Sequence, residues 1–422
     1  MTPDDDTSLS LPEIRVPAGW TFAGLAGGLF LGLVLRGTAA EAPVLAVAGP
    51  VGSLWLRALQ MTILPLVAAL LFTGVVQTVA AAQAGAIARR ALALFAAVLT
   101  TGTVFAALVV PPLLDAFPIP AQAATALGGM ARADPGPVPG LAEVIASLIP
   151  TNVVEAAGQN AMLPVIVFFG LFALAATRLP AVQRDPLAGL FGALAAAMMV
   201  VIGWVLTLAP IGVFALGLSV AAQSGSAVIA ALAHYIVLVS AIGAVVLIAG
   251  YGLAVTGARL RLIAFARAML PVQTVAFSTQ SSLASLPAML AACRTLGLRQ
   301  ASADFVLPLA VALFRATGPA MNLAVAIYVA RLTDTPLTPA TLAAGVGVAL
   351  LTTLGSVSLP GAISFVTAIG PIALAMGVPI EPLALLVAVE MLPDLIRTVG
   401  NVTLDVAVTA TVDRRGRQGI DA

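Results

Sequence analysis

The sequence predicts an all-α polytopic membrane protein, with eight transmembrane helices and two re-entrant helical hairpins. Of its 422 residues, 61% are hydrophobic and 9% are charged, whereas a soluble domain carries about 25% charged residues. The apolar residues form long runs, and about 20 of them in a row suffice to cross a bilayer. Toward the C-terminus the runs become short and are interrupted by Ser, Thr, Gly and Pro, which is typical of segments that enter a membrane and turn back.

The first three predicted spans are continuous and lie near Trp20–Leu35, Ala42–Val76 and Ala91–Leu114. The second contains Pro65, where a kink is expected because proline cannot complete the helical hydrogen-bond ladder. Small residues allow helices to approach closely in a membrane. The first span has a flat side made of four glycines, Gly24, Gly27, Gly28 and Gly32.

The middle of the chain is predicted to alternate loops and spans. A Pro/Gly/Ala-rich segment, Phe117–Gly140, is expected to form an external loop. A less regular membrane segment follows at 148–173, and a span near Leu190–Ala209 ends in the run Ala-Pro-Ile-Gly-Val-Phe. The next span, Ala227–Val255, contains the single histidine, His234.

Three interrupted segments follow. Phe265–Cys293, with a serine-rich tip, and Leu342–Met376, with its tip at Gly355–Gly361, have apolar arms too short to span a core that needs about 20 residues, so both are predicted to be re-entrant hairpins. Between them, Phe305–Arg331 is interrupted at Phe314–Pro319, which predicts a helix broken inside the membrane. Non-helical backbone at that depth must be buried in protein or line a cavity, and paired interrupted segments point to a transporter's binding site.

The distribution of the arginines between the two sides of the membrane tests this topology. With the N-terminus in the cytoplasm, thirteen of the 19 basic residues fall in inside loops and tails, three fall outside, and three lie within membrane segments. The positive-inside rule favours this orientation, and it also puts the C-terminus in the cytoplasm. We therefore expect a multi-pass protein of the cell (inner) membrane with both termini cytoplasmic.

The last predicted span carries a polar stripe. At about 100° per residue, six polar or charged side chains fall within an arc of roughly 100°. Each charge would cost about 3 kcal/mol or more if it faced lipid, so the stripe must face protein, water or a ligand. Structural polar contacts, including an ion pair within the helix, are the alternative to a binding site. The six residues are Glu390, Asp394, Arg397, Thr398, Asn401 and Asp405.

Several other classes are disfavoured. Cys293 is alone, which excludes an intrachain disulfide and a cysteine metal cluster. Gly-rich phosphate loops, zinc spacing and nucleic-acid modules are absent from the sequence, and we expect no organic cofactor, no metal site and no nucleic-acid partner. An intramembrane serine protease would need a Ser/His pair. His234 lies on a continuous helix away from the serine-rich tip, which argues against this enzyme.

The sequence resembles the glutamate transporter family, the dicarboxylate/amino acid:cation symporters. The resemblance covers nearly the whole chain, and its most specific part is Asp394-Leu-Ile-Arg-Thr-Val-Gly-Asn-Val-Thr-Leu-Asp405. Further matching runs are Leu64–Val67, Ile149–Asn152, Ala209–Phe214, Val306–Leu309 and Leu359–Gly361, together with the serine tip before Leu286-Pro287.

The resemblance implies a homotrimer in which a mobile transport domain carries the substrate past a static scaffold in an elevator motion. The implied division of the chain is 1–90 scaffold (spans one and two), 91–114 transport domain (span three), 115–222 external loop and scaffold (spans four and five), 223–258 transport domain (span six), 259–299 first re-entrant hairpin, 300–335 broken span seven, 336–378 second re-entrant hairpin, and 379–422 span eight with a cytoplasmic tail.

The resemblance also implies an acidic substrate. Arg397 offers a planar donor fork that suits a carboxylate, and Asp394, one turn earlier, could accept an ammonium group. Both together favour aspartate or glutamate, while a C4-dicarboxylate remains an alternative. Further substrate contacts are implied at Thr398 and Asn401, and at the hairpin tips by Ser281, Ser282, Leu359 and Gly361.

The broken helix departs from the sodium-driven relatives. Their run Asn-Met-Asp-Gly-Thr is here Phe314-Arg315-Ala316-Thr317-Gly318, so two side chains that help bind sodium are lost, and hard cations need oxygen ligands. We expect Arg315 to take the place of a bound sodium and to neutralise Asp405, with snorkelling of Arg315 to an interface as the alternative. A sodium site made mainly of backbone carbonyls near the second hairpin stays open.

A proton could then drive uptake. A carboxylate withdrawn from water takes up a proton more readily, and Glu390 is the first candidate, ahead of Asp394, Asp405 and His234. The sequence leaves open the choice between aspartate and glutamate, the coupling ion and its stoichiometry, and the direction of transport.

Overall fold

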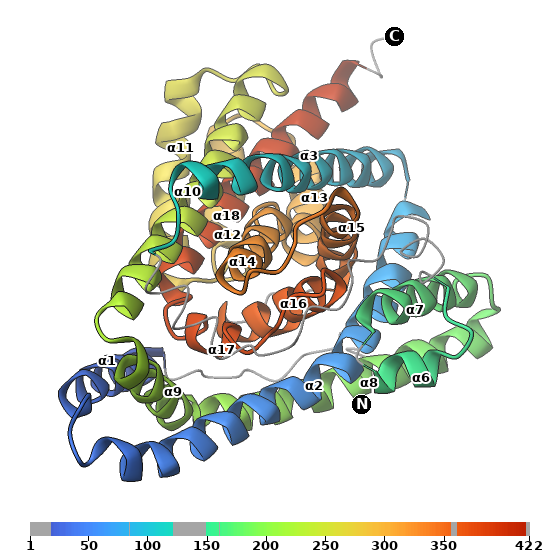
Figure 1. Cartoon of the computed structure of the whole chain (residues 1–422). Coiled ribbons are helices and arrows are strands. Elements are labelled where there is room, and N and C mark those ends of the chain that lie inside the picture. The colour runs from blue at the N-terminus through green and yellow to red at the C-terminus, as the bar shows by residue number, and fades with distance from the viewer. Residues whose placement is uncertain (1–17, 84, 121–148, 160, 356–360, 419–422) are drawn as a thin grey trace, which may run out of the picture.

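The chain is described by a computed structural model covering residues 18–83, 85–120, 149–159, 161–355 and 361–418. These residues form α-helices and contain no strand (Figure 1), which confirms the predicted all-α class. Seven of the described helical segments are long and apolar enough to cross a membrane, so the protein is a multi-pass membrane protein. They are Glu41–Gln83, Ala86–Ala116, Ala181–Thr207, Ala227–Thr256, Leu262–Thr279, Gln300–Leu332 and Met391–Arg414.

The continuous spans agree with the prediction. Their helices are α1 (Ala18–Leu35), α2 (Glu41–Gln83), α3 (Ala86–Ala116) and α10 (Ala227–Thr256). The irregular segment after the external loop is a short helix, α6 (Val153–Gly158), followed by α7 (Met162–Ala176). Most of the predicted external loop, residues 121–140, lies outside the described residues.

The span that was predicted to finish near Ala209 is followed by a further helix. α8 (Ala181–Thr207) stops at Leu208, and α9 (Ala209–Ser224) begins at the next residue. Pro210 lies in the first turn of α9, where its missing N–H leaves no helical hydrogen bond unmade. α9 packs along α1 and α2, and α2 also packs on α8, so these four helices lie together along one side of the molecule (Figure 1).

Three glycines of α1 make the contact with α9. A Cβ atom at Gly24, Gly28 or Gly32 would collide with the backbone carbonyl of Pro210, Phe214 or Leu218 respectively. Both sets repeat every four residues, so one helix backbone lies directly on the other. The fourth glycine, Gly27, has only the Phe214 ring 3.7 Å from such an atom. The flat side predicted for the first span is therefore confirmed, with three glycines in tight contact.

Gly28→Ala is expected to lower thermal stability, because a methyl group placed against a carbonyl forces the two helices apart, at about 1–3 kcal/mol. The matched control is Gly27→Ala, one residue away, whose methyl group meets an ordinary contact. Both variants gain the same helix propensity from alanine. The melting temperatures of the purified proteins in detergent check this, and equal values would contradict the packing described.

Each of the three predicted interruptions lies between two helices, and whether the two hairpins re-enter the membrane stays a prediction. The first hairpin consists of α11 (Leu262–Thr279) and α12 (Leu286–Thr295), and α11 is longer than the expected arm. The second consists of α15 (Pro339–Gly355) and α16 (Gly361–Ala375), with tip residues 356–360 outside the described residues. The broken helix is α13 (Gln300–Leu313) and α14 (Gly318–Leu332).

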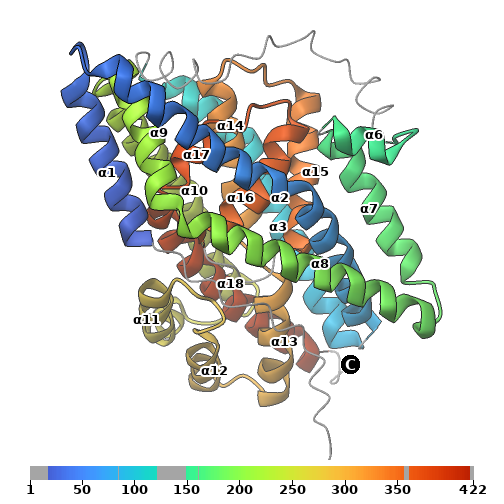
Figure 2. The ribbon, with the colours of Figure 1, turned by 90° about the horizontal axis from the view of Figure 1, so that it is seen from below.

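These segments surround the last long helix. A one-turn helix, α17 (Leu383–Leu386), precedes α18 (Met391–Gln418). α18 packs against α10, α11, α12, α13 and α3. Figure 2 shows α11 and α12 at the end of the molecule where α18 finishes, and α15 and α17 toward the other end. The polar stripe of α18 therefore lies inside the helix assembly.

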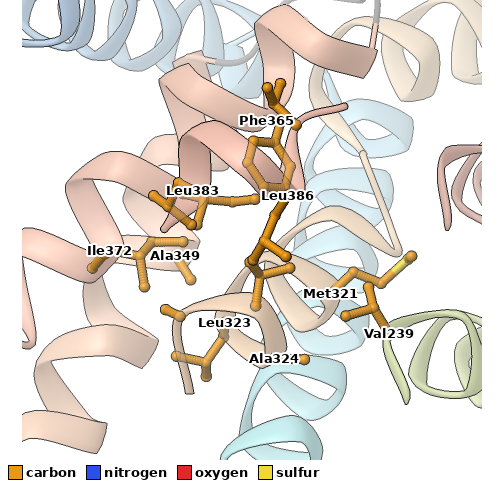
Figure 3. Packing of buried hydrophobic residues seen from close by; sticks show 14 of the residues in the cluster. Val239, Met321, Leu323, Ala324, Ala349, Phe365, Ile372, Leu383 and Leu386 are labelled. Atoms are coloured by element: carbon orange, nitrogen blue, oxygen red, sulfur yellow. The ribbon is translucent and has the colours of Figure 1, made fainter. Parts of the chain in front are cut away.

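The core beside the stripe is apolar and closely packed. Phe365 of α16 lies beside Leu386 of α17, Ile372 of α16 lies beside Ala349 of α15, and Leu323 of α14 belongs to the same buried cluster (Figure 3). All residues of α14 except Arg331 are buried. This packing fixes the position of the second half of the broken helix against the hairpin.

Candidate functional site

The polar stripe is almost completely enclosed. Its six side chains are between 1% and 5% exposed. The sequence prediction placed all six on one helix, but Glu390 lies in the turn before α18. The carbonyl oxygen of Glu390 accepts the Asp394 N–H at 2.9 Å, so Glu390 immediately precedes the first helical turn. The stripe therefore consists of Glu390, just before the start of α18, and five residues on one face of α18.

Arg397 is the centre of a buried charge cluster. Its Nη2 donates to Oε1 of Glu390 at 2.6 Å, and its Nε lies 3.7 Å from Oδ1 of Asp394. The hydroxyl of Tyr235, from α10, donates to the other oxygen of Glu390 at 2.9 Å. Nε and Nη1 of Arg397 are buried and have no hydrogen-bond partner within the described residues. A buried donor without a partner is costly, so these two groups are suited to a ligand's oxygen atoms.

Asn401, one turn further along α18, is joined to the helix break. Its Oδ1 accepts the backbone N–H of Thr317 at 3.0 Å and lies 2.8 Å from the Thr317 hydroxyl. That hydroxyl is also 3.1 Å from the carbonyl oxygen of Arg397. The break between α13 and α14 is therefore fixed directly to the face of α18 that carries Arg397.

Arg315 lies at the same break and is half-buried. The charged groups that act on it are Asp394, Arg397 and Asp405. Both carboxylate oxygens of Asp405 are buried and have no hydrogen-bond partner in the described part of the chain. The charge that acts on Asp405 is that of Arg315, so these two residues interact through space without a hydrogen bond between them.

The amino-acid sequence of the chain matches a known protein family. Residues 18–415 match the model of the sodium:dicarboxylate symporter family, which is nearly the whole chain. The chain belongs to this family. The resemblance seen in the sequence is thereby confirmed.

Two symporters and a transport protein are among the proteins similar to this family member. A proton/glutamate-aspartate symporter of Escherichia coli (strain K12) is 28% identical over 364 residues, which is 84% of this chain and 82% of that protein. A proton/sodium-glutamate symport protein of Bacillus subtilis (strain 168) is 27% identical, covering 90% of this chain and 88% of that protein. A C4-dicarboxylate transport protein of Anaeromyxobacter sp. (strain K) is 26% identical, covering 86% and 83%.

The apolar residues of the break occupy the two positions where the resemblance implies oxygen-bearing side chains in sodium-driven relatives. Phe314 is 1% exposed and stacks on Phe95 of α3, with ring centroids 4.5 Å apart. Ala316 is also 1% exposed. Neither side chain carries an oxygen atom, so neither can supply a side-chain ligand to a cation. Within the described residues no group of three His, Cys, Asp or Glu side chains could hold a metal ion.

The hairpin tips of this symporter are only partly described. Ser281 and Ser282 lie at the tip of the first hairpin, where Oγ of Ser281 accepts the Ala284 N–H at 3.2 Å. Within the described residues, neither serine side chain makes a hydrogen bond to the Arg397 cluster. Leu359 lies outside the described residues, and Gly361 is the first residue of α16.

His234 is outside the cluster. Its Nε2 lies 3.1 Å from the carbonyl oxygen of Phe117, at the end of α3, and its ring is 5.7 Å from that of Tyr328. It therefore fastens α10 to α3. A cavity of about 370 Å³ between α2, α7 and residues 377–381 is lined by none of the predicted site residues.

Two residues of the cluster were missed by the sequence analysis, Tyr235 and Thr317. Tyr235 follows His234 on an apolar helix. A buried tyrosine hydroxyl needs a polar partner, so this residue could have been predicted to contact the polar stripe. Thr317 stands in the interruption itself, where backbone N–H groups lack helical partners. Their partners lie 155 and 84 residues away in the chain, so the sequence could not pair them.

Proposed function

We propose that this protein is a secondary active transporter of acidic amino acids, aspartate or glutamate, that is independent of sodium and coupled to protons. It belongs to a family of cation symporters, and its relatives include both glutamate-aspartate symporters and C4-dicarboxylate transport proteins. The observation that carries the proposal is Arg397, which is 2% exposed and has two N–H groups without partners beside two carboxylates.

The opposite charges of Arg397 and Asp394 favour an acidic amino acid over a dicarboxylate as the substrate. Arg397 donates to the side-chain carboxylate of the substrate from Nε or Nη1, which have no hydrogen-bond partner within the described residues, and a hydrogen bond between a guanidinium and a carboxylate is a strong one. Asp394 accepts the substrate's ammonium group. A dicarboxylate without an amine would leave Asp394 without a cationic partner from the ligand, at a cost in affinity. Thr398, Asn401, the Ser281-Ser282 tip and the second tip at Leu359 and Gly361 complete the proposed contacts.

The proposed loss of sodium coupling is based on Arg315, which lies at the break between α13 and α14. Arg315 acts on Asp405 as a fixed positive charge, at a place where sodium-driven relatives bind a mobile one. A second cation added beside a guanidinium in a medium of low dielectric would be strongly repelled. Arg315 therefore substitutes for the ion, and transport proceeds without sodium at this position.

Glu390 is proposed to carry the coupled proton. When ionised, it occupies Arg397 with a bond of 2.6 Å and competes with the substrate's carboxylate. When protonated, it releases the guanidinium charge, so that proton and substrate bind together. The titratable groups that act on Glu390 are Tyr235 of α10 and Asp394 and Arg397 of α18.

Glu390→Gln is expected to abolish the pH dependence of uptake. The wild type should take up less substrate as the pH rises, because more Glu390 is ionised and pairs with Arg397. The neutral glutamine imitates the protonated state at every pH. Initial rates of radiolabelled aspartate uptake between pH 5 and 9 check this, with Glu381→Gln as the matched control outside the cluster. A Glu390→Gln profile that still falls with pH would assign the proton elsewhere.

The whole proposal is tested in proteoliposomes. Sodium and proton gradients are imposed separately, and uptake of radiolabelled aspartate is measured with glutamate and succinate as competitors. We expect uptake that follows the proton gradient and weak competition by succinate. Strong dependence on sodium with none on protons would contradict the coupling, and stronger competition by succinate would indicate a C4-dicarboxylate transporter.

The assembly is proposed from the family resemblance. We place both termini in the cytoplasm and the chain in the inner membrane as a homotrimer with an elevator motion. The excess of arginine in the predicted inside loops supports this orientation. Crosslinking in native membranes, followed by mass measurement, tests the trimer.

A further inference from the structure

Thr317 makes a contact that the proposed transport mechanism has not yet used. It is completely buried in the break between α13 and α14, and it binds Asn401 through both its backbone N–H and its hydroxyl. Asn401 stands one turn beyond Arg397 on the same face of α18. A residue that fixes Asn401 can therefore determine how that amide meets a ligand.

The backbone N–H determines which way the amide is turned. An Asn side chain offers an oxygen that accepts and an NH₂ group that donates. The Thr317 N–H can only donate, so the atom 3.0 Å from it must be the oxygen. The hydroxyl of Thr317, 2.8 Å from the same oxygen, can donate as well. The NH₂ group is turned away from the break and makes no hydrogen bond within the described residues.

Close packing fixes Thr317 against α18. A Cβ atom on Gly400 would lie 2.5 Å from the methyl group of Thr317, so only glycine at that position lets the two helices meet. Asn401 is 3% exposed, and water has little access to it. If the amide were flipped, its NH₂ group would face the Thr317 N–H, with two donors against each other, and a buried polar group without a partner is unfavourable.

We infer that Thr317 is a positioning residue of the substrate site, which holds the Asn401 amide with its NH₂ group as a donor for a substrate carboxylate. This inference rests on the proposed transport of acidic amino acids. Arg397 and Asn401 are then both donors, one for each carboxylate of the substrate. Since the Asn401 oxygen is already engaged by Thr317, the ammonium group of the substrate is left to Asp394.

Thr317→Val tests the inference, because valine keeps the shape of threonine and removes the hydroxyl. We expect the KM for aspartate to rise about fivefold, corresponding to one lost hydrogen bond of about 1 kcal/mol, with kcat unchanged. Thr317→Ser retains the hydroxyl and should stay within about twofold of the wild type. If the valine variant does not accumulate in the membrane, Thr317→Ala serves in the same comparison.

A double-mutant cycle separates positioning from a general structural role. In an Asn401→Ala background, Thr317→Val should leave the KM unchanged, because the residue acts through the Asn401 amide. A KM of Thr317→Val equal to the wild type, or an equal rise in both backgrounds, would overturn the inference while leaving the proposed function in place. A wild type that takes up no acidic amino acid would overturn both.

Discussion

Arg397→Met is expected to abolish binding and uptake of acidic amino acids. The side chain is enclosed and supplies two unpartnered N–H groups, and removing one partner of a buried charge pair costs about 2–5 kcal/mol. An affinity loss of about a hundredfold or more follows, since about 1.4 kcal/mol is a factor of ten. Binding of radiolabelled aspartate to the purified protein measures it. Arg397→Lys keeps the charge without the planar fork and should bind at an intermediate level.

Arg397→Met has a side effect that needs its own control. It leaves Glu390 buried without its cation, and such a charge destabilises a protein by about 3–5 kcal/mol. The double variant Arg397→Met/Glu390→Gln removes both charges of the pair, and it should recover most of the thermal stability without recovering uptake. Aspartate uptake by this double variant would show that another residue anchors the substrate.

Arg315→Met is expected to have the second largest effect. It removes the cation that acts on Asp405, whose two oxygens have no hydrogen-bond partner within the described residues. Uptake should fall at least about tenfold and the protein should melt at a lower temperature, because a lone buried charge is costly. Arg315→Lys keeps the positive charge and should retain most of the uptake. Arg315→Met/Asp405→Asn should recover the stability, which identifies the charge pair as the cause.

Restoring the residues of the sodium-driven relatives tests whether Arg315 substitutes for a bound sodium ion. Phe314→Asn, Arg315→Met and Ala316→Asp together bring back two oxygen-bearing side chains and remove the guanidinium. We expect the triple variant to acquire uptake that rises with external sodium, whereas the wild type is unaffected when choline replaces sodium. Wild-type uptake that stops in choline would refute the substitution of sodium by Arg315.

Segments with a strong local signal were predicted well. The three interruptions were found from Ser, Thr, Gly and Pro within apolar runs, and the helices end at or near them. The contact face of α1 was found because glycine has no side chain and its spacing matches one helix face. These features depend on neighbouring residues alone. The sequence does not predict the extra helix α9, because the proline after Ala209 is compatible with the end of a span as well as with the start of a new helix.

Contacts across the chain could not be predicted. Both Asp394 and Glu390 were named as candidates, but the shorter ion pair of Arg397 is with Glu390, which lies in the turn before α18. Arg315 was expected to neutralise Asp405, and only the structure shows that neither Asp405 oxygen has a hydrogen-bond partner within the described residues. Side-chain direction at a helix break depends on the packing of several elements.

By itself, the sequence determined the class of protein, the family and the set of buried charges, because hydropathy, glycine spacing and an Asp-Arg-Asn-Asp pattern are local properties of the chain. The tertiary structure alone decided which partners those charges have. Tyr235 reaches Glu390, and Thr317 reaches Asn401, because α10 and the break of the seventh span pack against one face of α18. Hydrogen bonds extend only about 3 Å, so their pairing is set by the folded arrangement of helices that are far apart in the chain.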